Sequence, residues 1–398
     1  MTAPQESGDS SRRPGEGVSV VMLSANFHPH LGGAEKQALE LSKGLMALGV
    51  KVAVATRRMP GLPPYEEVEG VPVFRLTACG SGMVNSISFL CSAFFFLLKK
   101  RAEYDVIHVH IASSHALAAC AAAWLTGKKV AVKFAASRDF GDVSTSLSTL
   151  AGRVKLKALG LFRPTALIIN PEIEQEMRAA SLHIPMKAFR NGVDTGKYVP
   201  LSYSAKIELK RKMGFTGEPL FVFAGRLTAQ KRLLEFLEVW AELKREMPDS
   251  RAQFVLVGEG PLSEELKKAA AALEISRDIV FAGLQRDMLP YYQAADIFTL
   301  PSSAEGLSNA MLEAMSCGLA IFASRIGGAR EAVAEGESGL LFDPYSRTEI
   351  KNGLRRFFED APLARAMGGR ARAAAMERYC MSKVAREALG IYRELCAE

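Results

Sequence analysis

Two cations follow an apolar run in the second half of the chain and could bind phosphate. Arg226 comes directly after the run 220–225, and Lys231 lies five residues further on, where a helical pattern begins. A planar guanidinium and a mobile ammonium at one strand-end turn are groups that bind diphosphate oxygens. Two solvated surface cations would give the same local pattern, so this pair alone leaves both interpretations open.

A second strand-end loop, 302–309, has the features of an anion site. Gly306 permits close approach of a ligand to the backbone, and the amides after it would begin a helix whose N-terminus faces that ligand. We therefore predict a donor-binding segment made of Gly306, Leu307, Ser308 and Asn309.

Two carboxylates in this region could hold a sugar. Glu305 lies in the loop and Glu313 about two helical turns further on, so both could face one ligand. Carboxylates accept hydrogen bonds from sugar hydroxyls. The alternative is that Glu305 stabilises the helix through the helix dipole and that Glu313 is merely exposed.

The first half of the chain offers two further candidates. Gly32 and Gly33 begin a helix after the first strand, but they do not form the Gly-x-Gly-x-x-Gly fingerprint of nicotinamide enzymes. A bare helix N-terminus at Gly33 could still receive phosphate.

His108 and His110 lie two residues apart on a strand and share one face, so one of them could donate to a substrate oxygen. We expect no metal site, because no carboxylate or thiol completes a ligand set.

Short apolar runs alternate with helical patterns from residue 18 onward. This alternation predicts an α/β protein with parallel sheets and crossover helices, here two Rossmann-like doubly wound domains facing a cleft. In such sheets ligands bind outside the carboxyl ends of the strands, where the candidate residues lie. The strands are expected at 18–27, 50–56, 71–76, 105–110, 130–134, 166–169, 220–225, 252–258, 278–283, 295–301 and 319–324.

The length of 398 residues suits two domains. We expect a disordered tail at 1–17, an acceptor domain at 18–195, a donor domain at 205–375 and a C-terminal helix, 376–398, that returns to the first domain. The stretch 191–204 is turn-rich, and the linker is expected near its end. The hinge is expected near residues 190–204 and before the final helix.

The composition narrows the class of protein. Six cysteines without a Cys-x-x-Cys pair, and a tail without a signal-peptide core, predict a reduced cytoplasmic protein. The net charge of +7 raises the possibility of anionic partners, but nucleic acid is not expected, because aromatic and basic residues are not interleaved.

The apolar stretch 87–98 ends in Lys99, Lys100 and Arg101. It is shorter than the roughly 20 residues of a spanning helix. Peripheral contact with an anionic membrane is one interpretation, and burial against the sheet is the other.

Taken together, these motifs resemble the retaining glycosyltransferases of family 4, which have the GT-B fold. The resemblance spans nearly the whole chain after the tail and rests on the order and spacing of GGAE, DVIHVH, NGVD, GRLTAQK, LVGEGPL and EGLSNAMLEAMSCGLAIFASRIGG.

The resemblance implies roles for the candidate residues. Arg226 and Lys231 would bind the diphosphate of a UDP- or GDP-linked sugar, Glu305 the transferred sugar and Glu313 the ribose. His110 would contact the sugar near its anomeric carbon, and Gly33 would lie where donor phosphate or acceptor enters. No cofactor or metal is implied, and the acceptor would be a glycan, a lipid-linked molecule or a small molecule.

One segment departs from the family. Members commonly carry a His-Asp or similar polar pair where this chain has the stretch from Lys133 to Asp139, so acceptor handling there stays open. A nucleotide-sugar epimerase of the same fold and a non-catalytic nucleotide-sugar-binding protein are the alternatives to a transferase.

Overall fold

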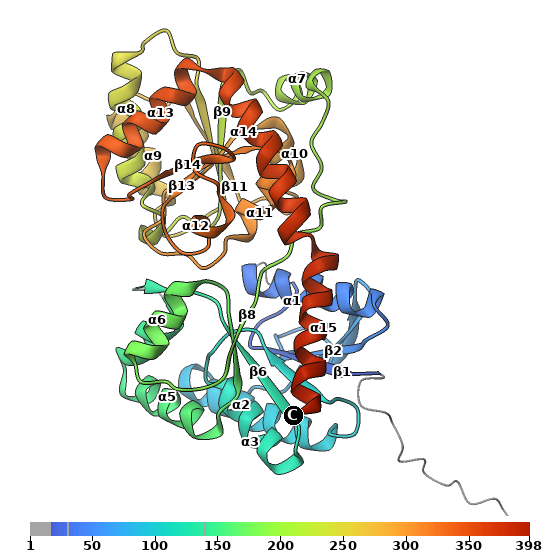
Figure 1. Ribbon diagram of the computed structural model, residues 1–398. Coiled ribbons are helices and arrows are strands. Elements are labelled where there is room, and N and C mark those ends of the chain that lie inside the picture. The colour runs from blue at the N-terminus through green and yellow to red at the C-terminus, as the bar shows by residue number, and fades with distance from the viewer. Residues whose placement is uncertain (1–16, 30–31, 139–140) are drawn as a thin grey trace, which may run out of the picture. The chain divides into compact units, whose positions relative to one another are not determined.

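The computed structural model describes residues 17–29, 32–138 and 141–398, which form a mixed α/β protein with two sheets (Figure 1). The predicted tail, apart from Gly17, lies outside the described residues, as does Asp139 of the segment that departs from the family.

The first sheet has eight strands in the order β3-β4-β2-β1-β5-β6-β7-β8. The pairs among β1, β2, β4, β5 and β6 are parallel, and β3 is antiparallel to β4. The strands are β1 (Ser19–Ser24), β2 (Lys51–Arg57), β3 (Tyr65–Val68), β4 (Val71–Leu76), β5 (Val106–Val109), β6 (Lys129–Phe134), β7 (Thr165–Ile168) and β8 (Met186–Ala188).

Two of these strands escaped prediction. β3 carries Glu66 and Glu67 and lies at an edge of the sheet, so it lacks the apolar run that marks an inner strand. β8 has only three residues, which is too short for a periodic pattern. The helices of this part are α1 (Gly33–Ala47), α2 (Gly82–Lys99), α3 (His115–Thr126), α4 (Asp142–Leu147), α5 (Leu150–Phe162) and α6 (Pro171–Ala179).

The second sheet has six strands in the order β11-β10-β9-β12-β13-β14, and its pairs are parallel. Five of them lie where the sequence predicted strands, and β14 was missed. The chain builds the sheet outward from β9 in one direction and from β12 in the other, so the β9/β12 boundary is the topological switch point. The strands are β9 (Leu220–Ala224), β10 (Gln253–Val257), β11 (Ile279–Gly283), β12 (Ile297–Leu300), β13 (Ala320–Ser324) and β14 (Gly339–Phe342).

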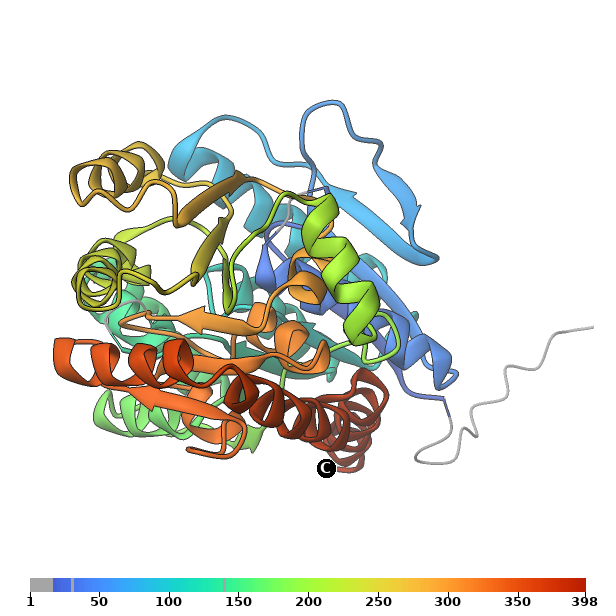
Figure 2. The ribbon, with the colours of Figure 1, turned by 90° about the horizontal axis from the view of Figure 1, so that it is seen from above.

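Helices pack on this sheet around a buried aromatic core. Trp240 lies with its ring 5.1 Å from that of Phe221 and 5.5 Å from that of Phe254. Figure 2 shows α13 and α14 as successive orange-to-red helices. The helices are α7 (Tyr203–Lys212), α8 (Leu233–Glu246), α9 (Ser263–Ala272), α10 (Leu289–Ala294), α11 (Asn309–Ser316), α12 (Ala329–Ala332), α13 (Arg347–Glu359) and α14 (Ala361–Ala374).

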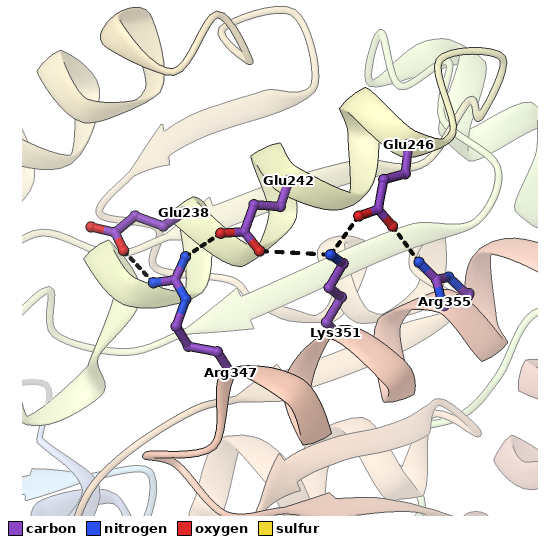
Figure 3. A network of polar contacts seen from close by, with 6 residues as sticks. All are labelled: Glu238, Glu242, Glu246, Arg347, Lys351 and Arg355. Carbon is purple, nitrogen blue, oxygen red and sulfur yellow. Dashed lines mark hydrogen bonds and ion pairs between the residues drawn. The ribbon is translucent and has the colours of Figure 1, made fainter.

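A row of ion pairs joins α8 to α13 (Figure 3). The charged residues recur every four positions on each helix, so on each helix they lie along one face. Arg347 contacts Glu238 and Glu242, Lys351 contacts Glu242 and Glu246, and Arg355 contacts Glu246.

The contacts of the chain divide it into two compact units. The first comprises the described residues up to Lys133 together with Ala158–Ala166 and Ala385–Glu398, and the second comprises Phe134–Lys157 and Leu167–Val384. The last helix, α15 (Met381–Ala397), begins after a π-helical turn at Ala375–Tyr379. The domain boundaries expected from the sequence remain predictions.

Candidate functional site

The carboxyl ends of β9 and β12 carry the two loops in which the sequence predicts a phosphate site. β9 and β12 are neighbours at the switch point of the second sheet. Arg226 and Lys231 follow β9, while Glu305 and the segment from Gly306 to Asn309 follow β12. The fold therefore brings together, within one unit, Lys231 and Glu305, which are 74 residues apart in the chain.

The loop after β9 lies directly against the loop after β10. The Gly225 amide donates to the Val257 carbonyl at 3.0 Å, and the Leu227 amide donates to the Glu259 carbonyl at 3.0 Å. A Cβ on Gly258 would lie 2.0 Å from the Gly225 carbonyl oxygen, so only glycine fits there. This backbone packing fixes the turn, and the Arg226 side chain at its tip is exposed.

Lys231 and Glu305 form an ion pair between the two loops. The Lys231 ammonium contacts Oε1 of Glu305, and the Ser302 hydroxyl donates to the same oxygen at 2.7 Å. Each charged side chain is 15% exposed. The cation predicted for the diphosphate and the carboxylate predicted for the sugar are therefore adjacent and only partly covered.

The first turn of α11 is capped by Ser308. The Ser308 hydroxyl accepts a hydrogen bond from the Met311 amide at 3.3 Å. The Glu305 carboxylate contacts Lys231 and Ser302 instead, so the side chain that caps this helix is Ser308 and not Glu305.

Gln230 ties the two loops together next to the ion pair. Its side-chain amide donates to the Ala304 carbonyl at 2.6 Å, and its own carbonyl accepts from the Ser303 amide at 2.9 Å. Because Gln230 precedes Lys231 and Ala304 precedes Glu305, these hydrogen bonds keep Lys231 and Glu305 next to each other.

Two glycines after β13 pack against the backbone of the loop that follows β12. Gly327 has φ +47°, and a Cβ there would lie 2.1 Å from the Glu305 carbonyl oxygen. The Gly328 amide donates to the Gly306 carbonyl at 2.6 Å. The backbone of the β12 loop is thus held between two other strand-end turns.

Glu313 lies inside the second unit and is 5% exposed. Burial, followed by the negative charge of Glu313 and a hydrogen bond to its carboxylate, raises the pKa of Tyr292. The Tyr292 hydroxyl therefore stays protonated and donates to that carboxylate. The interpretation of Glu313 as a merely exposed residue is therefore wrong.

Polar residues elsewhere in the second unit form hydrogen bonds with the loop that follows β12. The Ser137 hydroxyl lies 3.2 Å from the Glu305 carbonyl oxygen and 3.0 Å from Oε2 of Glu172. Burial favours a raised pKa for Glu172, but bonds from Arg138 and Ser137 outweigh burial and lower that pKa. The Asn191 amide donates to the Leu307 carbonyl at 2.8 Å and to Oδ1 of Asn309 at 2.9 Å.

The candidates of the first half lie at the switch point of the first sheet, where β1 neighbours β5. Gly33 begins α1 after β1, and His110 directly follows β5. A Cβ on Gly32 would lie 1.9 Å from a carboxylate oxygen of Glu35, so the Glu35 side chain folds back over the start of α1.

His110 is buried in a histidine stack. The His108 and His110 rings are parallel within 8°, with centroids 4.3 Å apart, and Nδ1 of His108 lies 2.5 Å from the Tyr392 hydroxyl. Burial and the charge of Lys133 lower the pKa of His108 to about 3. Burial, followed by the proximity of His108 and Lys133, also lowers the pKa of His110 well below its ordinary value. Both imidazoles are therefore neutral at physiological pH, and the two rings share one face as predicted.

Among the residues that the structure describes, no group of three or more His, Cys, Asp or Glu side chains is placed to hold a metal ion. The predicted independence from metal stays a prediction.

Sequence reasoning left out the residues that position this site. Gln230 and Ser302 lie in the loops already singled out, and their closeness to Lys231 and Glu305 was the available signal. Ser137 and Tyr292 gave no such signal, because their partners, Glu305 and Glu313, are distant in the chain.

Two family models match consecutive parts of the chain. The model described as "Glycosyl transferase 4-like domain" matches residues 32–176, and "Glycosyl transferases group 1" matches residues 205–374. The two matches contain every residue proposed for the site.

Named relatives resemble the chain over most of its length. It is 26% identical to the GDP-mannose-dependent alpha-(1-6)-phosphatidylinositol monomannoside mannosyltransferase of Mycolicibacterium smegmatis, covering 88% of this chain and 91% of the relative. It is 29% identical to the UDP-Gal:alpha-D-GlcNAc-diphosphoundecaprenol alpha-1,3-galactosyltransferase of Escherichia coli, covering 86% and 89%.

A solved structure shares the fold. The crystal structure of Anabaena Alr3699/HepE in complex with UDP-glucose aligns with a TM-score of 0.77 at 18% identity, covering 94% of this chain and 98% of that one. Since both family models and the fold agree with the motifs at the strand ends, the chain belongs to the family 4-like glycosyltransferases of the GT-B fold.

Proposed function

We propose that the protein is a retaining, metal-independent glycosyltransferase that moves a sugar from a nucleoside-diphosphate donor to an acceptor hydroxyl. The observation that carries the proposal is the ion pair of Lys231 and Glu305 at the β9/β12 switch point. An ammonium is complementary to a diphosphate and a carboxylate to sugar hydroxyls, so a nucleotide sugar would engage both groups.

In this proposal the protein acts mainly by charge stabilisation. Arg226 and Lys231 would neutralise the diphosphate as the bond between the anomeric carbon and the phosphate oxygen breaks. The acceptor oxygen would bond to the same face of that carbon and pass its proton to the leaving phosphate. No protein nucleophile is required, and no cofactor takes part.

The other predicted residues would orient the donor. Glu305 would hold the transferred sugar and Glu313 the ribose, while the segment from Gly306 to Asn309 would receive the diphosphate. In the first unit, neutral His110 would contact the sugar near its anomeric carbon, and Gly33 would lie where donor phosphate or acceptor enters.

The names of the relatives support this choice of substrates. One relative is named for GDP-mannose and a phosphatidylinositol mannoside, another for UDP-Gal and a diphosphoundecaprenol-linked sugar, and the Anabaena structure contains UDP-glucose. We therefore propose a UDP- or GDP-linked donor and a glycan, lipid-linked or small-molecule acceptor. The proposal includes a cytoplasmic location with peripheral contact at an anionic membrane.

A donor screen with EDTA present tests the proposal. Purified protein should be stabilised against heating by one class of nucleotide sugar and should then transfer or slowly hydrolyse that sugar, with the product anomer assigned by NMR. Release of an epimer without acceptor would favour the epimerase alternative. Binding without turnover on any acceptor would favour the non-catalytic alternative, and an inverted anomer would contradict retention.

A further inference from the structure

Helix α2 is apolar on two opposite faces. It has no charged residue before Lys99. Phe89, Ala93 and Leu97 are buried, and they recur every four residues on the face toward the protein. Val84, Ile87, Cys91 and Phe95 form the opposite stripe and are exposed, with Ile87 at 55% and Phe95 at 65%. The expectation that this helix would be buried against the sheet is therefore met by only one of its faces.

The neighbouring helix α3 also exposes apolar side chains. α2 and α3 pack side by side in the first unit (Figure 1). Near the end of α3, Trp124 is 76% exposed and Leu125 is 57% exposed. Tryptophan combines an apolar ring with a polar N–H group and is enriched at the boundary between membrane and water.

Cations gather at the end of this surface. Lys99 ends α2, and Lys100 and Arg101 follow it. After α3 come Lys128 and Lys129, of which Lys129 begins β6. Lys128 lies beside the segment that leads from α2 to β5, because its Nζ lies 3.4 Å from Oδ1 of Asp105 and 5.8 Å from the ring of Tyr104.

Within residues 99–129 the cations outnumber the carboxylates. Residues 99–129 contain five cations and two carboxylates, Glu103 and Asp105, which gives a net charge of +3. An anionic surface would complement that charge. A second copy of the same surface would oppose it with the same sign.

The fold favours a helix that lies on the membrane. By length and composition alone α2 could cross a bilayer, since it spans 18 residues rather than the 12 of the apolar stretch considered in the sequence. Its ends, however, lead into β4 and β5, which belong to one sheet with only β2 and β1 between them, and its inner face is buried. Crossing would detach that face from the protein core, whereas an interfacial position keeps it packed.

We infer that the outer faces of α2 and α3, namely Val84, Ile87, Cys91, Phe95, Trp124 and Leu125, dock on an anionic lipid bilayer with the cations of 99–101 and 128–129 at the headgroups. The inference deepens the membrane contact included in the proposed function by naming its surface. It does not depend on the transfer chemistry.

Vesicle flotation of the full chain tests the surface. We expect binding to vesicles of phosphatidylcholine mixed with phosphatidylglycerol, and weak binding to phosphatidylcholine alone. The double variant Ile87→Ser and Phe95→Ser should lower partitioning by about tenfold or more, because two apolar side chains no longer leave water. Leu284→Ser removes a similarly exposed apolar residue, at 61%, from the second unit and should leave binding unchanged. Equal binding of all three proteins would overturn the inference.

Tryptophan fluorescence supplies an independent readout. The chain has two tryptophans, of which Trp240 is fully buried and Trp124 is exposed. Anionic vesicles should shift the emission to the blue and brominated lipids should quench it, and both effects should vanish in Trp124→Phe. Vesicle binding without these effects would overturn the named surface. A protein that does not bind vesicles, but that forms a dimer which the double variant abolishes, would also overturn it.

The donor screen separates this inference from the proposed function. The double variant should keep the heat stabilisation by the nucleotide sugar, which shows that it is folded. A chain that binds anionic vesicles through this surface but is stabilised by no nucleotide sugar would contradict the proposed function and support the membrane surface.

Discussion

Lys231 and Glu305 neutralise each other across the β9/β12 switch point, and the hydroxyl of Ser302 shares the same carboxylate oxygen. The two residues proposed to hold the diphosphate and the transferred sugar of a donor are thus in contact with each other.

Lys231→Ala should raise the dissociation constant of the donor by roughly 10- to 100-fold, because a hydrogen bond to a charged group contributes about 1.5–3 kcal/mol. Glu305→Gln should chiefly lower kcat. Isothermal titration with the nucleoside diphosphate and steady-state kinetics with the full donor distinguish the two effects. Lys268→Ala, at an exposed position on α9, is the control, and unchanged constants for Lys231→Ala would contradict the assigned site.

Glu313→Gln should raise the dissociation constant of the donor, since a neutral amide accepts hydrogen bonds from ribose hydroxyls less strongly than a carboxylate. Tyr292→Phe should act in the same direction but more weakly, because the Tyr292 hydroxyl orients Glu313. Comparing a nucleoside diphosphate with its 2′-deoxy form measures the ribose contact. A Glu313→Gln protein that still discriminates fully between them would exclude this role.

The buried histidines should make stability depend on pH. In the folded state the pKa of His108 is about 3 and that of His110 is also strongly lowered, so between pH 3 and about 6.5 the unfolded chain binds protons that the folded chain does not. The free energy of unfolding should therefore fall as pH decreases below about 6.5, by about 1.4 kcal/mol per pH unit for each histidine.

Urea denaturation at pH 7 and pH 5 checks this slope. His108→Gln should flatten it, whereas His183→Gln, at an exposed position, should not. A slope that is the same in all three proteins would show that the stacked pair is not its source.

The ion pairs between α8 and α13 should contribute little to stability. Arg347→Ala removes contacts to Glu238 and Glu242, all half-exposed, so we expect a loss of about 0.5–1 kcal/mol at low salt and less at high salt. Thermal denaturation at two salt concentrations measures both values. A loss that does not change with salt would indicate packing rather than charge.

Two adjacent glycines of α14 should respond oppositely to alanine. A Cβ on Gly368 would lie 2.0 Å from the Gly318 carbonyl oxygen, whereas a Cβ on Gly369 meets nothing within 4 Å. Gly369→Ala should stabilise the protein by about 0.5–1 kcal/mol through helix propensity, and Gly368→Ala should destabilise it. Chemical denaturation of the two variants measures both changes in the free energy of unfolding. Equal effects would contradict this packing of α14.

The alternation of apolar runs and helical patterns was enough to predict two parallel sheets, because inner strands such as β9 and β12 are buried on both faces and read as continuous apolar segments. It also predicted that chemistry would concentrate after those strands, since Arg226, Lys231 and Glu305 lie in the loops that follow them. Periodicity could not reveal the edge strand β3, which is charged, or the three-residue strand β8.

The tertiary structure alone decided which groups meet. Lys231 pairs with Glu305 because β12 returns beside β9, and no local pattern in either segment encodes that adjacency. The same holds for the hydroxyl of Tyr392 beside His108, 284 residues away, and for the exposed stripe of α2. An amino-acid sequence specifies which side chains are polar or apolar along each element, but strand order determines which of them become neighbours and which stay in water.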